Sequence, residues 1–259
     1  MNSIHANGID IRYDIAGEGP WLLLSHSLAT DLSLWDDQMA SLTARFRVLR
    51  YDTRGHGGSS APDRPYDFPL LAADVIGLMD VLDVRKAHFV GISMGGMITQ
   101  HVALTAPERI DRLVLVSTTS GYPPEARAMW GDRIAAVRAN GMEPLVAPTL
   151  ERWFTPAWRQ AHPDVMTRIG ALIRATPAAG YIGSGQAIAT LDTTSRLSGL
   201  RCPPLVIAGA EDAGTPPAMG RKIAEQIPGA RFESIDSASH LCNVEQAEKF
   251  NRLLLDFLG

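Results

Sequence analysis

The stretch Gly91-Ile92-Ser93-Met94-Gly95 decides the fold of this chain. The apolar run 87–90 before it is typical of a buried strand, and residues 94–104 after it have the apolar spacing of a helix. A strand, a tight turn and a helix in this order expose a serine at the end of a sheet strand. The bare pattern also arises by chance in glycine-rich loops, but the flanking strand and helix favour function. We therefore expect Ser93 to be a nucleophile.

Length and charge narrow the class of protein. With 259 residues, of which 46% are apolar, the chain is long enough to bury one large core, either as a single domain or as a domain with an insertion. Lys and Arg number 24 against 28 Asp and Glu, which gives a formal charge of −4. No basic stripe is present to follow a phosphate backbone, so nucleic acid is not expected as a partner.

Neither a membrane nor a cofactor is expected. The N-terminus has no basic segment followed by an apolar one, and no apolar run approaches the roughly 18 residues that span a bilayer. We therefore predict a soluble, cytoplasmic protein. Cys202 and Cys242 lie outside any metal-ligand spacing, which predicts neither a zinc site nor a disulfide framework. The sequence leaves open whether the chain forms a homo-oligomer.

Strands and helices are predicted to alternate along most of the chain. Residues 9–14 alternate between apolar and polar side chains after Asn7-Gly8, a pair that suits a type I′ turn, so a hairpin of two antiparallel edge strands is expected there. The alternation predicts an α/β fold: a mostly parallel eight-stranded sheet with helices on both faces. The remaining strands are expected at 21–24, 46–51, 87–90, 113–116, 205–208 and 231–235, and the helices at 34–44, 70–82, 94–104, 217–226 and 244–257.

The pattern changes after residue 119. No convincing buried strand follows until about residue 194, but helix-length stretches occur at 124–140, 143–154, 164–175 and 177–189. We interpret 121–194 as a helical cap inserted into a core of 1–120 and 195–259. These helices could be purely structural. A lid over Ser93 is favoured, because helices inserted after a parallel strand pack near its carboxyl end.

A serine hydroxyl needs a base within hydrogen-bond reach and a carboxylate that orients the base. His240 lies between the last predicted strand and the last predicted helix, where the base follows in the chain order serine, acid, histidine. The loop after strand 205–208 supplies Asp212 as the acid, with Glu211 as the second candidate. Asp236 is the third, because it ends its strand immediately.

Taken together, these residues make the chain resemble the α/β-hydrolases, with Ser93, Asp212 and His240 as the catalytic triad. Further motifs resemble one subfamily, the 3-oxoadipate enol-lactonases, over nearly the whole chain. The most specific of them lie in the predicted cap, where hydrolase subfamilies differ most. The motifs are 25–35, 50–57, 151–156 and the pair Gly180-Tyr181.

The resemblance implies an oxyanion hole made by the backbone N–H groups of Leu28 and Met94. Many hydrolases have His-Gly where this chain has His26-Ser27, but enol-lactonases also carry serine there, so the departure favours the subfamily. We expect His26 to hydrogen-bond within its own loop. A bracing rather than a substrate-binding role is likewise expected for Asp52, Arg54 and His56.

The resemblance also implies a reaction. The expected activity opens 3-oxoadipate enol-lactone to 3-oxoadipate, in the β-ketoadipate pathway of aromatic catabolism, without a cofactor. Alternatives are a general carboxylesterase or lactonase, a carbon–carbon bond hydrolase of aromatic degradation, and a small-molecule receptor with an intact triad. Dehalogenases and epoxide hydrolases are disfavoured, because they carry aspartate where this chain has Ser93.

A carboxylated substrate needs a cationic partner in the cap. Arg133 is favoured, because it stands three residues after Trp130 and this pair resembles the enol-lactonase cap; a solvated role for it remains open. Trp130 and Trp153 are expected to form an apolar wall. The other candidate arginines are Arg152, which is the next choice, and Arg138, Arg159, Arg168 and Arg174.

Overall fold

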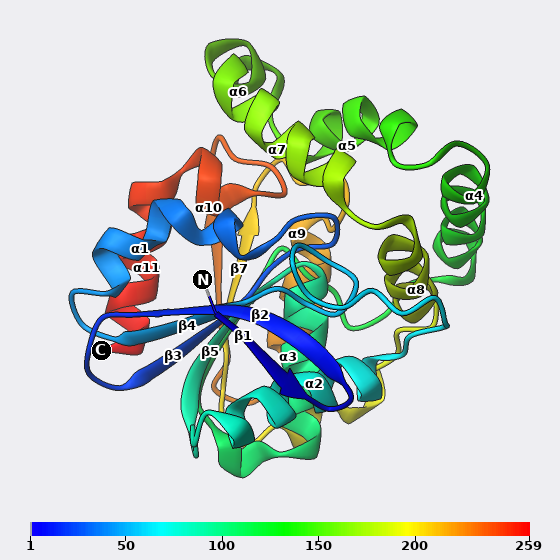
Figure 1. The fold of residues 1–259 in the computed structure, drawn as a ribbon. Coiled ribbons are helices and arrows are strands. Elements are labelled where there is room, and N and C mark those ends of the chain that lie inside the picture. Colours follow the sequence, from blue (N-terminus) through cyan, green and yellow to red (C-terminus); the bar gives the residue numbers. More distant parts are fainter. Residues whose placement is uncertain (1) are drawn as a thin grey trace.

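A computed structural model describes residues 2–259, and an eight-stranded sheet in the order β1-β2-β4-β3-β5-β6-β7-β8 forms its centre (Figure 1). β2 pairs antiparallel with both β1 and β4, and all other neighbouring strands are parallel. The predicted α/β architecture is therefore confirmed. The strands are β1 (Asn2–Ala6), β2 (Ile9–Ala16), β3 (Trp21–Ser25), β4 (Arg47–Tyr51), β5 (Ala87–Ile92), β6 (Ile110–Val116), β7 (Leu205–Gly209) and β8 (Arg231–Ile235).

Local sequence explains both the edge and the centre of this sheet. Asn7 and Gly8 both have positive φ, 46° and 76°, which is the geometry of the type I′ turn that joins β1 to β2. Inner strands are covered on both faces, and for this reason they read as continuous apolar runs. Leu22, Leu23 and Leu24 of β3 are accordingly wholly buried.

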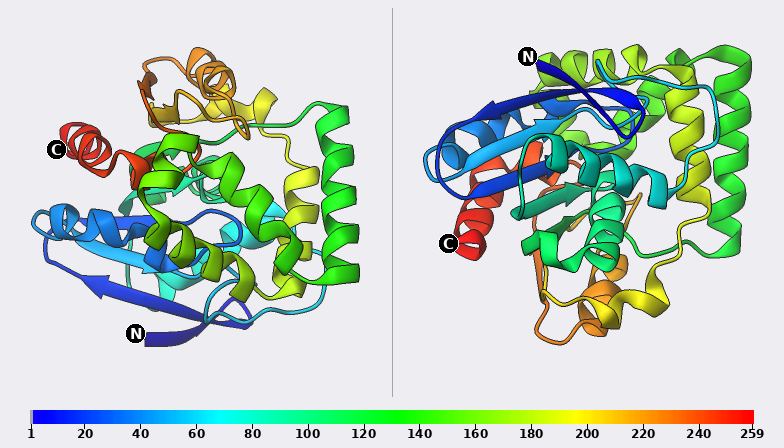
Figure 2. Two further views of the ribbon diagram at one scale, coloured as in Figure 1. Left: turned by 90° about the horizontal axis from the view of Figure 1, so that it is seen from above. Right: turned by 60° about the horizontal axis from the view of Figure 1, so that its bottom comes forward.

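Helices cover both faces of the sheet (Figures 1 and 2). α1 (Asp36–Leu42) packs beside α11 (Ala247–Leu258) on one face, and α2 (Phe68–Val81) packs beside α3 (Met94–Thr105) on the other, where α9 (Pro217–Gln226) contacts β7. Short 3₁₀ turns occupy Leu32–Trp35, Pro107–Arg109, Glu143–Leu145 and Thr194–Gly199.

Five helices lie between β6 and β7 in the chain and gather at one end of the molecule (Figure 1). A single antiparallel bridge between Gly121 and Asp192 brings the two ends of this segment together. We continue to interpret 121–194 as a cap on a core of 1–120 and 195–259. The helices are α4 (Pro124–Asn140), α5 (Val146–Trp153), α6 (Pro156–Ala161), α7 (Pro163–Ala175) and α8 (Ala178–Ala189).

Three predicted helices differ from the structure, and one further helix was not predicted. Residues 143–154 form the 3₁₀ turn Glu143–Leu145 followed by α5. Residues 34–44 form a 3₁₀ turn followed by the shorter α1. The predicted helix 244–257 is two helices, α10 (Cys242–Glu245) and α11, because Gln246 leaves the helical region with φ −129° and ψ 50°. α6 was not predicted, since six residues between prolines are too few to show a helical period.

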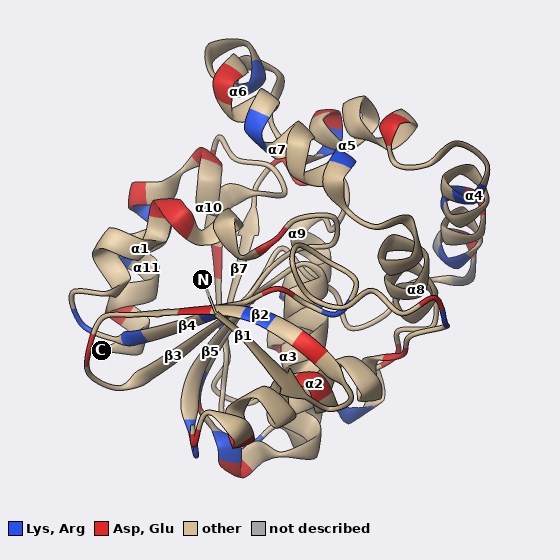
Figure 3. Cartoon of the chain, viewed as in Figure 1, with Lys and Arg blue, Asp and Glu red and all other residues tan. Residues whose placement is uncertain are grey.

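Charged residues of both signs are interspersed along the helices and loops that face the viewer in Figure 3. Within residues 2–259, none of the helices combines the length and the apolar character needed to cross a membrane.

One contact between the cap and the core predicts a stability difference. A Cβ at Gly180 in α8 would lie 1.9 Å from the carbonyl oxygen of Gly55, so backbone would have to move. We expect Gly180→Ala to lower the free energy of unfolding by about 1–3 kcal/mol, measured by urea denaturation. Gly131→Ala in α4 is the matched control, because its Cβ would meet nothing within 4 Å; it should stabilise by about 0.5–1 kcal/mol. Equal effects of the two changes would contradict this contact.

Candidate active site

Ser93 occupies a strained turn between β5 and α3. Its φ of 55° and ψ of −117° are unfavourable for a side chain with a Cβ, and its backbone N–H donates to Val116 O at 2.8 Å. A Cβ at Gly91 would lie 2.4 Å from the carbonyl oxygen of Gly95, and a Cβ at Gly95 would lie 2.1 Å from that of Ser25. The turn therefore requires the two glycines that flank the serine in the sequence.

His240 and Asp212 are hydrogen-bonded beside this turn. The His240 Nδ1 lies 2.8 Å from the Asp212 Oδ2, and the Asp212 side chain is fully buried. The backbone N–H groups of Gly214 and Thr215 donate to Oδ1 at 2.8 and 3.0 Å, and the Thr215 hydroxyl donates to Oδ2 at 2.8 Å.

These contacts favour the ionised form of Asp212 and orient the His240 ring. Burial raises the pKa of Asp212, but the charge of His240 and the hydrogen bonds from His240 and Thr215 outweigh it, so the pKa lies below its usual value. An ionised Asp212 accepts the Nδ1–H of His240, and this tautomer turns Nε2 into the free proton acceptor of the ring. Thr215 was not singled out from the sequence, although Asp followed three residues later by Thr is a pattern of local side chain–backbone bonding.

Neither of the other two candidate acids contacts His240. Glu211 is exposed. Asp236 has 87% of its side chain exposed and lies 3.8 Å from the Lys249 ammonium. The preference for Asp212 over its neighbours therefore agrees with the geometry.

The backbone N–H group of Met94 directly follows Ser93, and that of Leu28 belongs to the loop after β3, which lines the same cavity as Ser93. Within residues 2–259, neither group donates a hydrogen bond. Leu28 lines the cavity described below, and Met94 is the first residue of α3, where helix N–H groups have no intrahelical acceptor. Both donors are thus available to an external acceptor.

The polar residues of the neighbouring loops brace the backbone, as predicted. Burial is the main cause that lowers the pKa of His26, and burial together with His26 lowers that of His56 to about 3, so both imidazoles are neutral. The side chains of His26, Asp52, Arg54 and His56 are all buried, and each forms hydrogen bonds inside the protein. Their partners are Ser27 O and Thr53 N for His26, Leu32 N and Gly58 N for Asp52, Asp74 for Arg54, and Arg54 O for His56.

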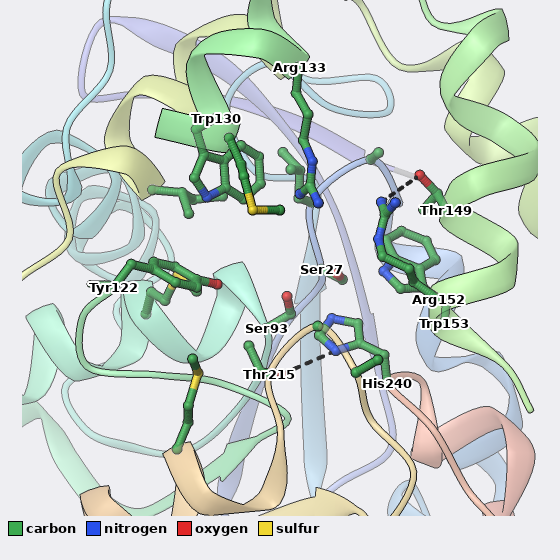
Figure 4. Close-up of a pocket in the computed structure, with 18 of the residues that line it drawn as sticks. Ser27, Ser93, Tyr122, Trp130, Arg133, Thr149, Arg152, Trp153, Thr215 and His240 are labelled. Atoms are coloured by element: carbon green, nitrogen blue, oxygen red, sulfur yellow. Dashed lines mark hydrogen bonds between the residues drawn. The ribbon is translucent and has the colours of Figure 1, made fainter. Parts of the chain in front are cut away.

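A cavity of about 300 Å³ lies between the sheet and the cap, and both Ser93 and His240 line it (Figure 4). Trp130 and Trp153, predicted as its apolar wall, also line it. The Trp153 ring stacks on His240 with 6.0 Å between ring centroids and an interplanar angle of 21°. Further lining residues that the sequence did not single out are Met97, Tyr122, Thr149 and Met219, while Tyr181 was noted only within a motif.

Two arginines line this cavity, and neither has an acidic partner within the described residues 2–259. Arg133 places its guanidinium carbon 4.9 Å from the centre of the Trp130 ring. Arg152 donates to the Thr149 hydroxyl at 3.2 Å. Burial and then the nearby charge of Arg133 lower the pKa of Arg152, which places the two cations within electrostatic reach of each other.

The other four arginines considered in the cap do not line the cavity. Arg174 forms an ion pair with Glu143, and Arg168 lies 3.5 Å from Asp37. Arg138 is exposed, and Arg159 is half-buried elsewhere. The cavity thus selects Arg133 and Arg152 from the predicted set.

Comparison with known proteins agrees with this arrangement. The family model for the alpha/beta hydrolase fold matches residues 20–247. The chain belongs to the α/β-hydrolase family. The prediction of a hydrolase is therefore confirmed.

Among α/β-hydrolases, the chain is similar to enol-lactonases, which confirms the predicted resemblance. It is 38% identical over 252 residues to "3-oxoadipate enol-lactonase 2" of Acinetobacter baylyi, covering 96% of this chain and 93% of that one. The crystal structure of the enol-lactonase from Burkholderia xenovorans has 40% identity and a TM-score of 0.96, with 99% of both chains covered. The structure of a thermophilic esterase from Thermogutta terrifontis has 28% identity and a TM-score of 0.95, and the match covers 100% of this chain and 98% of that one.

Replacing the acid should separate Asp212 from its neighbour. We expect Asp212→Asn to lower the rate of ester hydrolysis by about a thousandfold or more, because the amide no longer holds the His240 tautomer. Glu211→Gln is the matched control, and its rate should remain within about twofold of the unmodified protein, since the side chain is exposed. A larger loss for Glu211→Gln would move the acid to position 211.

Proposed function

We propose that the protein is a cytoplasmic enol-lactonase that hydrolyses 3-oxoadipate enol-lactone, or a closely similar carboxylated lactone, to the open acid. One observation carries this proposal: a largely apolar cavity lined by Ser93 is also lined by two arginines that have no acidic partner among residues 2–259. Unpaired cations in such a cavity favour an anionic substrate. The names of the similar proteins supply the particular lactone.

Ser93 is the nucleophile in the proposed mechanism. His240 removes the hydroxyl proton through Nε2, and the serine oxygen attacks the lactone carbonyl carbon. The resulting oxyanion accepts hydrogen bonds from the backbone N–H groups of Leu28 and Met94, each worth on the order of 3 kcal/mol in the transition state. Asp212, held ionised by its hydrogen bonds, stabilises the imidazolium that forms.

Ring opening then breaks the bond between the carbonyl carbon and the ring oxygen. The leaving group is an enolate, and His240 returns the proton to it. Water, deprotonated by His240, attacks the acyl-enzyme carbonyl and releases the carboxylic acid and free Ser93. The enol product tautomerises to a ketone, so no cofactor enters the reaction.

The cap supplies substrate selection in this proposal. Trp130 and Trp153 cover the apolar part of the lactone, and Arg133 binds its carboxylate, with Arg152 beside it. A carboxylate placed between two guanidinium groups would relieve their mutual repulsion, which is the physical reason to expect an anion there.

Other hydrolase reactions remain as alternatives for the same site. A general carboxylesterase or lactonase would use Ser93, His240 and Asp212 and would not need the arginines to bind its substrate. The same holds for a carbon–carbon bond hydrolase. A small-molecule receptor would bind without turnover. A panel of 3-oxoadipate enol-lactone, phenyl acetate and a vinylogous diketone, compared by kcat/KM, separates these alternatives.

The nucleophile and the base should act as one unit. We expect Ser93→Ala and His240→Ala each to lower kcat for lactone hydrolysis by several orders of magnitude, and the double variant to cost little more than either. Folding is checked by thermal denaturation. Losses that multiply in the double variant would contradict a shared proton transfer, and turnover that survives in Ser93→Ala would exclude this nucleophile.

Removing a cap cation should affect charged substrates only. Arg133→Met keeps the apolar stem and removes the charge, so kcat/KM for the carboxylated lactone should fall by at least about tenfold, or roughly 1.4 kcal/mol. The value for neutral phenyl acetate should stay near that of the unmodified protein. Arg138→Met, at an exposed position of the same helix, is the control.

The outcomes for Arg133→Met have distinct meanings. Equal losses on both substrates would indicate a structural role for Arg133. No loss on either substrate, followed by a selective loss for Arg152→Met, would assign the carboxylate to Arg152. No selective loss in either variant would remove the carboxylated lactone as substrate.

A further inference from the structure

The loop that carries His240 is hydrogen-bonded directly to the end of α5 in the cap. The Leu241 backbone N–H donates to Trp153 O at 3.2 Å, and the Ser239 hydroxyl donates to Arg152 O at 2.9 Å. These contacts join residues on both sides of His240 to Arg152 and Trp153, two of the α5 residues that line the cavity. The two segments are separated by more than 80 positions in the sequence.

Glu245 connects the same two segments through its carboxylate. Its Oε2 accepts the Ser239 backbone N–H at 2.5 Å, and its Oε1 accepts the backbone N–H and the hydroxyl of Thr155 at 2.8 and 2.9 Å. Ser239 precedes His240, and Thr155 lies between α5 and α6. Both oxygens of one side chain thus bridge the histidine loop and the cap.

This carboxylate is buried without an ion-pair partner. Glu245 is 6% exposed, and within residues 2–259 no Lys, Arg or His forms a salt bridge with it. Burying a carboxylate is costly unless its oxygens accept hydrogen bonds, and charge-assisted bonds are the strongest available ones. The Ser239 N–H, the Thr155 N–H and the Thr155 hydroxyl all donate to the carboxylate, so both of its oxygens have to be acceptors. Glutamine of the same shape would turn an NH₂ group towards one of those donors.

The position of His240 depends on this bridge. Its imidazole stacks on Trp153, at the end of the same helix whose carbonyl groups hold the loop. A displacement of the loop relative to α5 would move Nε2 relative to Ser93 as well as relative to Trp153. Misplacement of a reacting group by about 1 Å can cost about a hundredfold in rate.

We propose that Glu245 is a positioning residue, which holds the His240 loop and the carboxyl end of α5 in one fixed arrangement and so keeps the base aligned with Ser93. The inference rests on the proposed roles of Ser93 and His240, but not on the identity of the lactone. It can therefore be tested with any ester that the protein hydrolyses.

The test compares Glu245→Gln with Glu248→Gln in hydrolysis of phenyl acetate. Glu248 is the matched control, because its side chain is 96% exposed in the neighbouring helix. We expect Glu245→Gln to lower kcat at least tenfold with KM within about twofold, since the ester does not need the cap arginines, and Glu248→Gln to change neither. Unchanged kcat in folded Glu245→Gln would overturn the proposal.

A double variant separates positioning from a general structural role. If Glu245 acts through His240, adding Glu245→Gln to His240→Ala should lower the residual rate no further. If Glu245→Gln lowers the rate by the same factor in the unmodified protein and in His240→Ala, Glu245 supports the fold rather than the base. That result would overturn the proposal.

A gentler variant covers the case in which Glu245→Gln fails to fold. Thr155→Val keeps the side-chain shape and removes only the hydroxyl donor, so kcat should fall by a smaller factor, with KM unchanged and no further loss in the His240→Ala background. Folding is followed by thermal denaturation. Folded Thr155→Val with the kcat of the unmodified protein would overturn the proposal.

Failure of the proposed function gives a different result. If the protein hydrolyses phenyl acetate through His240 but leaves the lactone intact, the lactone assignment fails and the role of Glu245 stands. If His240→Ala keeps full esterase activity, the proposed base itself is wrong.

Discussion

The close backbone contact around Ser93 is the constraint on which the rest of the site depends. Gly95 lets the first turn of α3 approach the carbonyl oxygen at the end of β3, and Gly91 lets the chain fold back over itself. Any Cβ at either position would separate the helix from the strands. This contact brings the N–H groups at the start of α3 beside the loop that contains Leu28. The strained conformation of Ser93 persists because the surrounding strands fix the backbone on both sides.

Most of the sheet could be predicted because its signals are local. β8, α4 and α9 occur at the predicted residues, since each combines a continuous pattern with proline or glycine at its ends. The separate helix α6 could not be predicted, because six residues are too few to show a helical period. The break at Gln246 could not be predicted either, because no change in the apolar spacing marks it. At Gln246, the side chain donates to Ser237 O across the histidine loop, a contact that no pattern within the helix reveals.

The same distinction holds for the site. Asp212 and His240 could be chosen because each follows a strand that ends at the same edge of the sheet, so order along the chain predicts their proximity. Thr215 and Glu245 were missed, because only the hydrogen bonds of the folded chain show their roles. The partner of Thr215 is Asp212, and one partner of Glu245 lies 90 positions away. For the arginines, the sequence provided a set of candidates, and only the folded cap selects the two that line the cavity.

The joined ends of segment 121–194 have a consequence for how such an enzyme changes during evolution. Besides the bridge between Gly121 and Asp192, the Thr193 N–H donates to Ser120 O at 2.7 Å, so the segment leaves and re-enters the core at almost one point. A substitute of different length can be inserted there without altering the spacing of β6 and β7. Exchange of the whole segment would then replace Trp130 and Arg133 together while Ser93 and Asp212 stay in place. If the cap selects the substrate as proposed, two crossovers that lie side by side in the fold would be enough to change the substrate range, provided that the new segment again meets the histidine loop.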